Sequence, residues 1–261
     1  MTAARLRRTT VVVREVLIVG VAVFLYFLVR GLVDAKRDLA FDHAERVIDA
    51  EQTWGVFVEP ELQSAVLRHG LLVDVSNWVY VYGHWPVVVL TLVWVLNRHP
   101  SEFTRIRNAM LISGAIGLVI FVYFPVAPPR FMTEYGFVDT VTERTNAYRV
   151  LQPPAFTNPY AAMPSLHFGW NLLMGIAWAS LSGNRWARLF GWLMPPLMFG
   201  AIVLTANHYL LDGVAGGALA MLGFVVATQL RATRRSSSPR PTRLPPPSPA
   251  LPGRAGEGSA P

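Results

Sequence analysis

The sequence predicts an all-α, polytopic membrane protein folded as a six-transmembrane-helix bundle. Of its 261 residues, 52% are hydrophobic and only 15% are charged, and the mean hydropathy is +0.36. Ordinary soluble domains carry roughly 25% charged residues. The apolar residues gather in blocks close to the ~20 residues that a helix needs to cross a bilayer. We therefore expect spans at residues 11–33, 71–96, 106–126, 166–182, 187–206 and 208–230.

The first of these spans has the features of an uncleaved anchor. Its basic start and the apolar run at residues 16–29 would also suit a signal peptide. A signal peptide ends at small residues, however, whereas Arg30, Asp34 and Lys36 follow this run. The chain has no cysteine, which excludes disulfides and thiolate metal sites.

Charge is distributed unequally between the two sides of the predicted bundle. The N-terminus, the 97–105 loop, the 183–186 turn and the C-terminal tail share one side, with 15 Lys and Arg against 3 acids. The other side has 8 against 13. Because basic loops stay in the cytoplasm, we expect a multi-pass plasma-membrane protein with both termini cytoplasmic. The arginines thus act as topology signals, and no nucleic-acid partner is expected.

Composition divides the chain into four regions. We expect an N-terminal tail and first helix at 1–33, an outer segment at 34–70, a membrane core at 71–230 and a disordered tail rich in Pro, Ser and Arg at 231–261. In the outer segment, apolar residues recur at helical spacing among charged ones, which predicts an amphipathic helix on the outer interface. These apolar residues are Phe41, Ala44, Val47 and Ile48.

Four residues suited to phosphate chemistry fall at span ends that face the same side. Arg130 follows the proline-rich end of the third span, His167 lies one turn into the fourth, and His208 and Asp212 open the sixth. The alternation of spans brings all four to the outer face, which predicts an active site there. Each also has an ordinary interpretation, such as a headgroup anchor for the arginine or a carbonyl-bound histidine.

Local spacing suggests how these residues would cooperate. On a helix, positions i and i+4 share a face, so Asp212 could orient His208 and leave one ring nitrogen free as a nucleophile or base. Ser165 precedes the fourth span, where it is either a helix cap or a phosphate ligand beside free backbone N–H groups. A carboxylate inside a span is costly and functional by default.

A second polar set predicts a substrate pocket. Asp74, Asn77, Tyr80 and His84 share one face of the second span, and Asn207 precedes His208. The alternative is that these side chains only bond neighbouring helices.

At these residues the chain resembles the type 2 phosphatidic acid phosphatase superfamily, over about residues 71–230. The resemblance implies six helices and a phosphohistidine mechanism without a metal or other cofactor. By the same resemblance, Arg130 and Ser165 would bind the phosphate, His167 would protonate the leaving alcohol, His208 would attack phosphorus and Asp212 would orient His208.

The chain departs from the hydrolase pattern of that superfamily at three places. Tyr123 stands where that pattern has a lysine, Leu166 replaces a glycine, and Ala201-Ile202 replace a Ser-Arg pair. The motifs at 163–170 and 208–212 are more similar to the inositol phosphorylceramide synthase branch, the inositolphosphotransferases. That branch implies transfer of a phosphorylated headgroup from a membrane lipid donor to a polyol or lipid alcohol.

Three alternatives remain open from the sequence. A lipid phosphate or undecaprenyl pyrophosphate phosphatase would use the same site for hydrolysis. A zinc-dependent intramembrane hydrolase would use His167, His208 and Asp212 as ligands, but Arg130 argues against a neighbouring metal. A transporter would use the histidines and Asp212 as a proton relay, although transport sites usually lie near the midplane.

Overall fold

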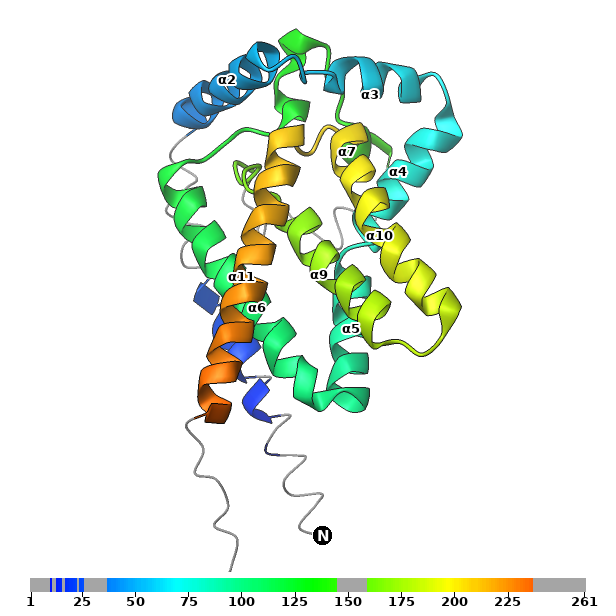
Figure 1. The fold of residues 1–261 in the computed structure, drawn as a ribbon. Coiled ribbons are helices and arrows are strands. Elements are labelled where there is room, and N and C mark those ends of the chain that lie inside the picture. The colour runs from blue at the N-terminus through cyan, green and yellow to red at the C-terminus, as the bar shows by residue number, and fades with distance from the viewer. Residues whose placement is uncertain are drawn as a thin grey trace, which may run out of the picture.

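The computed structural model describes residues 37–144 and 159–236, together with short pieces between residues 10 and 25. Regular structure in this part of the chain is helical, apart from an isolated bridge between Val126 and Ala161 (Figure 1). The helices are α2 (Arg37–Thr53), α3 (Glu59–Leu67), α4 (Gly70–Tyr82), α5 (Trp85–Arg98), α6 (Pro100–Tyr123), α7 (Thr140–Arg144), α9 (Leu166–Leu181), α10 (Arg185–Leu204) and α11 (Leu210–Ser236). Two 3₁₀ turns, η1 (Pro129–Phe131) and η2 (Thr133–Tyr135), follow α6.

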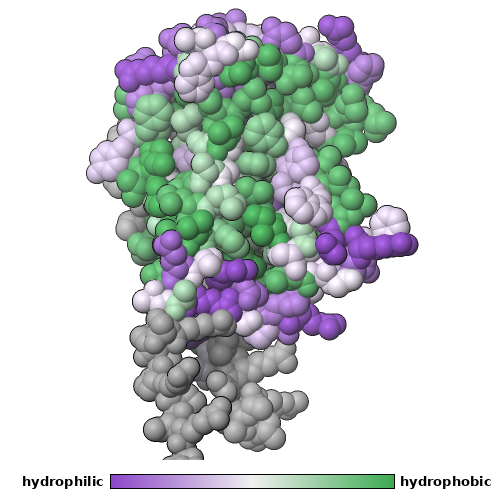
Figure 2. Space-filling model, viewed as in Figure 1, coloured by the Kyte–Doolittle hydropathy of each residue, from purple (hydrophilic) through white to green (hydrophobic). Residues whose placement is uncertain are grey.

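Four helices pack around α9, which lies inside the bundle. Helix α9 contacts α5, α6, α10 and α11, and α4 packs on α10 (Figure 1). On the face shown in Figure 2, apolar residues form a broad belt with polar side chains above and below it. This pattern fits a helical membrane protein, since the belt would face lipid and the rims would face water.

Fewer helices qualify as spans than the six expected. Among the described residues, α6, α10 and α11 are long and apolar enough to cross a membrane. Helices α4 and α5 count as a fourth span only if taken together, because they are bent by 43° at the break after Tyr82. Gly83 and Pro86 lie at this break, and a proline near a helix start removes a backbone donor. The predicted span at 71–96 is therefore two helices.

The remaining two expected spans differ for separate reasons. Helix α9 has only 16 residues, about 24 Å at 1.5 Å per residue, because Ser165 caps it and it ends at Leu181. Of the expected first span, only fragments between residues 13 and 25 are described, and these are helical. Glu15 in this segment is buried and pairs with Arg107 of α6.

Helix α11 continues past the expected end of the membrane core. It extends to Ser236, so the first residues of the predicted disordered tail are helical, while 237–261 fall outside the described residues. Arg231 in this extension pairs with Glu102 of α6 at 2.8 Å. At this end of α11, a salt bridge therefore holds α11 against α6.

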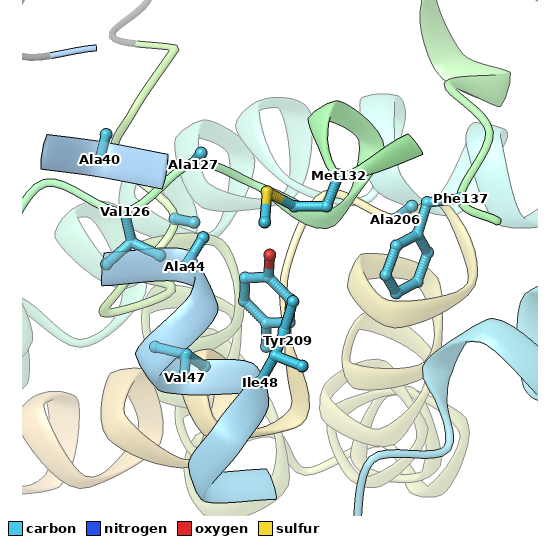
Figure 3. Packing of buried hydrophobic residues seen from close by; sticks show 11 residues of the cluster. Ala40, Ala44, Val47, Ile48, Val126, Ala127, Met132, Phe137, Ala206 and Tyr209 are labelled. Atoms are coloured by element: carbon cyan, nitrogen blue, oxygen red, sulfur yellow. The ribbon is translucent and has the colours of Figure 1, made fainter. Parts of the chain in front are cut away.

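Helices α2 and α3 cover one end of the bundle, which we call the α2 end (Figure 1). The predicted amphipathic helix is confirmed as α2, but it is more deeply packed than a helix lying on an interface. Ala40, Ala44, Val47 and Ile48 are buried against the segment after α6 and against Tyr209 (Figure 3). The α2 end also contains the connection from α6, the start of α9 and the turn between α10 and α11 (Figure 1).

Helices α9 and α11 approach each other at glycines. A Cβ on Gly216 would lie 2.1 Å from the Ser165 carbonyl oxygen, and one on Gly169 would lie 2.5 Å from the Gly216 carbonyl oxygen. Both distances are shorter than van der Waals contact allows. This close approach places the first turns of the two helices, and their polar residues, side by side.

Candidate active site

Arg130 is held rigidly at the α2 end by the turn that follows α6. Prolines end α6 and form the η1 turn, and the Arg130 backbone N–H donates to the Ala206 carbonyl at 2.8 Å. Its guanidinium donates to the Asn207 side-chain oxygen and lies 3.6 Å from an Asp139 carboxylate oxygen. Only 12% of its side chain is exposed. The arginine is therefore tethered to Asn207, the residue before His208, and shares part of its charge with Asp139.

Asn207 acts as the bridge between these residues. It is buried, and its side-chain nitrogen donates to Thr205 at the hydroxyl (2.9 Å) and at the carbonyl (3.2 Å). This fixes its oxygen as the acceptor for Arg130. The expectation that Asn207 lines a substrate pocket stays a prediction; in the structure its side-chain oxygen accepts a hydrogen bond from Arg130.

His208 lies in the turn before α11 and not on that helix. Ala206 has a positive φ of 52°, and the N–H groups of Asn207 and His208 both donate to the Ile202 carbonyl. The His208 Nδ1 atom lies 2.8 Å from the Ala162 carbonyl oxygen and 3.5 Å from an Asp212 carboxylate oxygen. Both neighbours are acceptors, so in the tautomer that satisfies them Nδ1 carries the proton and the lone pair is on Nε2.

The pairing of His208 with Asp212 therefore has a different origin from the one expected. Asp212 is the third residue of α11, and its carboxylate accepts the Tyr209 N–H at 2.9 Å, as in a capping box. The carboxylate thus bends back across the helix start toward His208. The expected neighbours are close, but the i, i+4 helical face is not the reason.

Two acidic residues that the sequence analysis missed complete this helix start. Glu59 of α3 accepts the Leu210 N–H at 2.9 Å, and Glu51 of α2 accepts the Leu211 N–H at 2.8 Å. Both carboxyl groups are fully buried, and each keeps one oxygen without a hydrogen-bond partner among the described residues. Burial, with Glu59 nearby, raises the pKa of Glu51 to about 9, so the Glu51 carboxyl keeps its proton at neutral pH.

His167 is in the first turn of α9, close to the other histidine. Its ring centroid lies 5.8 Å from that of His208, 4.2 Å from that of His84 and 4.8 Å from that of Tyr80, with which it stacks. Asn171 donates to the Gly83 carbonyl at 2.7 Å and holds the α4–α5 break against α9. The break therefore brings His84 and Tyr80 to His167.

Ser165 has the geometry of a helix cap. It is fully buried, its hydroxyl accepts the Phe168 N–H at 3.3 Å, and its backbone N–H donates to the Asp212 carbonyl at 2.9 Å. These bonds tie the start of α9 to the start of α11. A direct contact of the hydroxyl with phosphate stays a prediction.

The second polar set separates in the structure. Tyr80 and His84 lie against His167, whereas Asn77 is buried and exchanges two 3.0 Å hydrogen bonds with Thr140. Asp74 is exposed on α4. The hydrogen bonds of Asn77 therefore join α4 to the start of α7, as in the alternative that these side chains only bond neighbouring helices.

The described residues contain no group of three His, Cys, Asp or Glu side chains placed to hold a metal ion. In particular, the Nδ1 atom of His208 is already directed at the Ala162 carbonyl. The zinc alternative therefore has no ligand cluster in this part of the chain.

The fold and the site together define a helical membrane protein with two histidines, a carboxylate and an arginine gathered at one end of the bundle. The chain belongs to the PAP2 superfamily, whose family model matches residues 45–226. It is also similar to phosphoinositol dihydroceramide synthase of Bacteroides thetaiotaomicron, with 25% identity over 187 residues. That alignment covers 66% of this chain and 60% of the relative. No solved structure matches the chain significantly.

Proposed function

We propose that this protein is a lipid phosphotransferase that works through a phosphohistidine on His208. The observation that carries the proposal is the position of His208. Its Nδ1 proton is engaged by the Ala162 carbonyl and Asp212, and its ring lies 5.8 Å from that of His167. This arrangement leaves Nε2 available as a nucleophile next to a second histidine that can move a proton.

The reaction would proceed in two displacements. In the first, Nε2 of His208 forms a bond to phosphorus, the phosphorus–oxygen bond to the leaving alcohol breaks, and His167 gives that alcohol its proton. In the second, an acceptor hydroxyl gives its proton to His167 and attacks phosphorus, and the phosphorus–nitrogen bond breaks. Arg130 would stabilise the phosphoryl oxygens in both steps.

Transfer from a phosphodiester lipid is favoured over hydrolysis of a phosphomonoester. A phosphodiester carries one negative charge, and a phosphomonoester carries nearly two. Arg130 shares its charge with Asp139, and Tyr123, at the place of the lysine in the hydrolase pattern, is 78% exposed on the outside of the bundle. The limited positive charge suits the singly charged donor. The name of the Bacteroides relative is consistent with a polyol phosphate headgroup.

A chase experiment with a trapped intermediate tests the mechanism. Purified protein is incubated with a glycerophospholipid whose phosphorus is labelled, and then quenched in base. We expect a base-stable, acid-labile phosphoenzyme in the wild type and none in His208→Ala. His69→Ala is a matched control, because His69 is an exposed histidine at the start of α4. A labelled His208→Ala protein would overturn the mechanism.

The product distribution separates transfer from hydrolysis. With a labelled phosphodiester lipid and increasing acceptor alcohol, we expect label to move into a new lipid without a matching rise in free phosphate. Fastest turnover of phosphatidic acid, with products unchanged by any alcohol, would identify a lipid phosphate phosphatase instead.

A further inference from the structure

A pocket of about 270 Å³ lies at the α2 end, between α2 and the η1 turn. We infer that it receives the phosphorylated polyol headgroup of the lipid donor, with Arg130 at the phosphate and Arg37 donating to the hydroxyl groups of the polyol ring. This inference rests on the proposed function. The pocket is lined by Arg37, Phe41, Arg130, Phe131, Thr133 and Tyr160.

Arg130 joins the pocket to the catalytic histidines. It contributes to the lining, and its guanidinium is bonded to Asn207, the residue before His208. If Arg130 holds the lipid phosphate at the histidines, the headgroup attached to that phosphate would therefore lie in the pocket.

The walls of the pocket combine aromatic rings with guanidinium groups. Tyr160 meets Phe41 and Phe131 edge to face, at centroid distances of 6.5 Å and 6.3 Å. Arg37 lies over the ring of Phe41, and Arg130 over the ring of Phe131. Aromatic faces pack against the C–H faces of a cyclic polyol, while arginines donate to its hydroxyl and phosphate oxygens. Thr133 adds a hydroxyl group.

The two sides of the pocket are fixed to each other. The Ala127 N–H donates to the Ala40 carbonyl at 2.9 Å, and the Tyr135 hydroxyl donates to Glu45 at 2.6 Å. Both bonds connect α2 to the segment after α6. The pocket is thus largely preformed, as ligand sites usually are.

Size and position favour a headgroup over an acyl chain. Pockets for whole drug-sized ligands enclose roughly 300–1,000 Å³, so this one suits a single polar ring with its phosphate. It lies at the end of the molecule where polar side chains cap the apolar belt (Figure 2). Lipid headgroups occupy that level, and the acyl chains would extend along the belt.

Arg37 lies outside the part of the chain that the family model matches, which begins at residue 45. A headgroup contact from this residue would therefore be a feature of this chain's own N-terminal segment. Arg46 provides a matched control, because it is an exposed arginine on the same helix that does not line the pocket.

Binding measured by calorimetry on the purified protein tests the inference without turnover. With glycerophosphoinositol as the probe, we expect Arg37→Ala to weaken binding about tenfold or more, as for loss of a charge-assisted hydrogen bond. Arg37→Lys should restore part of the affinity, since it keeps the charge but loses the planar fork. Arg46→Ala should bind as the wild type does.

Glycerol phosphate is the discriminating probe, because it has the phosphate but no polyol ring. Its binding should be unchanged by Arg37→Ala. The inference is overturned if glycerophosphoinositol binding is also unchanged, or if both probes weaken equally. Labelling of His208 reports on the proposed function separately, so a bound headgroup without a phosphoenzyme would overturn only the mechanism.

Discussion

At the scale of single residues, the site depends on hydrogen bonds that fix protons. The sequence predicts that Arg130, His208 and Asp212 lie at one end of the bundle, and the structure places them there. This could be predicted because the order of the apolar segments determines which helix ends lie on the same side. The sequence could not predict that a backbone carbonyl, Ala162, would be the nearest partner of His208 at 2.8 Å. Such a contact joins positions distant in sequence and leaves no residue-type signal.

Glu51 and Glu59 were missed for the same reason, although Glu51 left a trace. It continues the buried face of α2 that Ala44 and Ile48 begin. An acidic residue on the apolar face of an amphipathic helix indicates a buried partner, here the first N–H groups of α11.

The buried proton on Glu51 predicts how stability depends on pH. Burial, with Glu59 and Asp212 nearby, raises the pKa of Glu51 from 4.5 to about 9. The stabilisation from keeping this proton is complete below pH 4.5 and is lost as pH rises through 9. Glu51→Gln is permanently neutral and can still accept the Leu211 N–H, so it should unfold at a higher temperature than the wild type at pH 9, with a smaller difference at pH 6.

Thermal unfolding in one detergent at both pH values measures this effect. Glu61→Gln is the control, because Glu61 is exposed on α3 and should show no such pH dependence. An equal loss of stability at both pH values in Glu51→Gln would show that Glu51 is bound as a carboxylate.

At the scale of elements, the position of α9 against α11 sets the distance between His167 and His208. Gly216→Ala would place a methyl group 2.1 Å from the Ser165 carbonyl oxygen, so the helices must separate. We expect the free energy of unfolding to fall by about 1–3 kcal/mol, as at other overpacked sites, and the phosphoenzyme to form more slowly. Unfolding temperature and labelling rate are the measurements.

Gly200→Ala on α10 is the matched control, because a Cβ there meets nothing within 4 Å. It should leave labelling unchanged and stability equal or slightly higher. If both alanine variants behave alike, the close approach of α9 and α11 does not limit the site.

Helix ends were predicted correctly where a proline or a capping side chain determines them. The prolines after Tyr123 and the cap at Ser165 mark real helix ends. The division of residues 71–96 into α4 and α5 was missed, although Gly83 and Pro86 signalled it. Hydropathy alone hides such a break, because both halves are equally apolar.

At the scale of the whole molecule, the expected convergence of loops is seen, while the side of the membrane stays a prediction. Since the chain has no cysteine, single cysteines can report on it. If the basic loops are cytoplasmic, Glu134→Cys at the α2 end should react with an impermeant thiol reagent in intact cells. Gly183→Cys, in the exposed turn between α9 and α10, should react only after lysis. The reverse pattern would place the site in the cytoplasm.

The capping of α11 by Glu51 and Glu59 also has a consequence for synthesis. Helices α2 and α3, which are made early, supply carboxyl groups to α11, whose N–H groups arrive some 150 residues later, from Glu59 to Leu210 and from Glu51 to Leu211. Until α11 is inserted, a nascent chain holds two acidic groups and the apolar face of α2 without their final partners. The α2 end can therefore assemble only after translation has passed α11, and a chain truncated before Leu210 should be a substrate for membrane quality control.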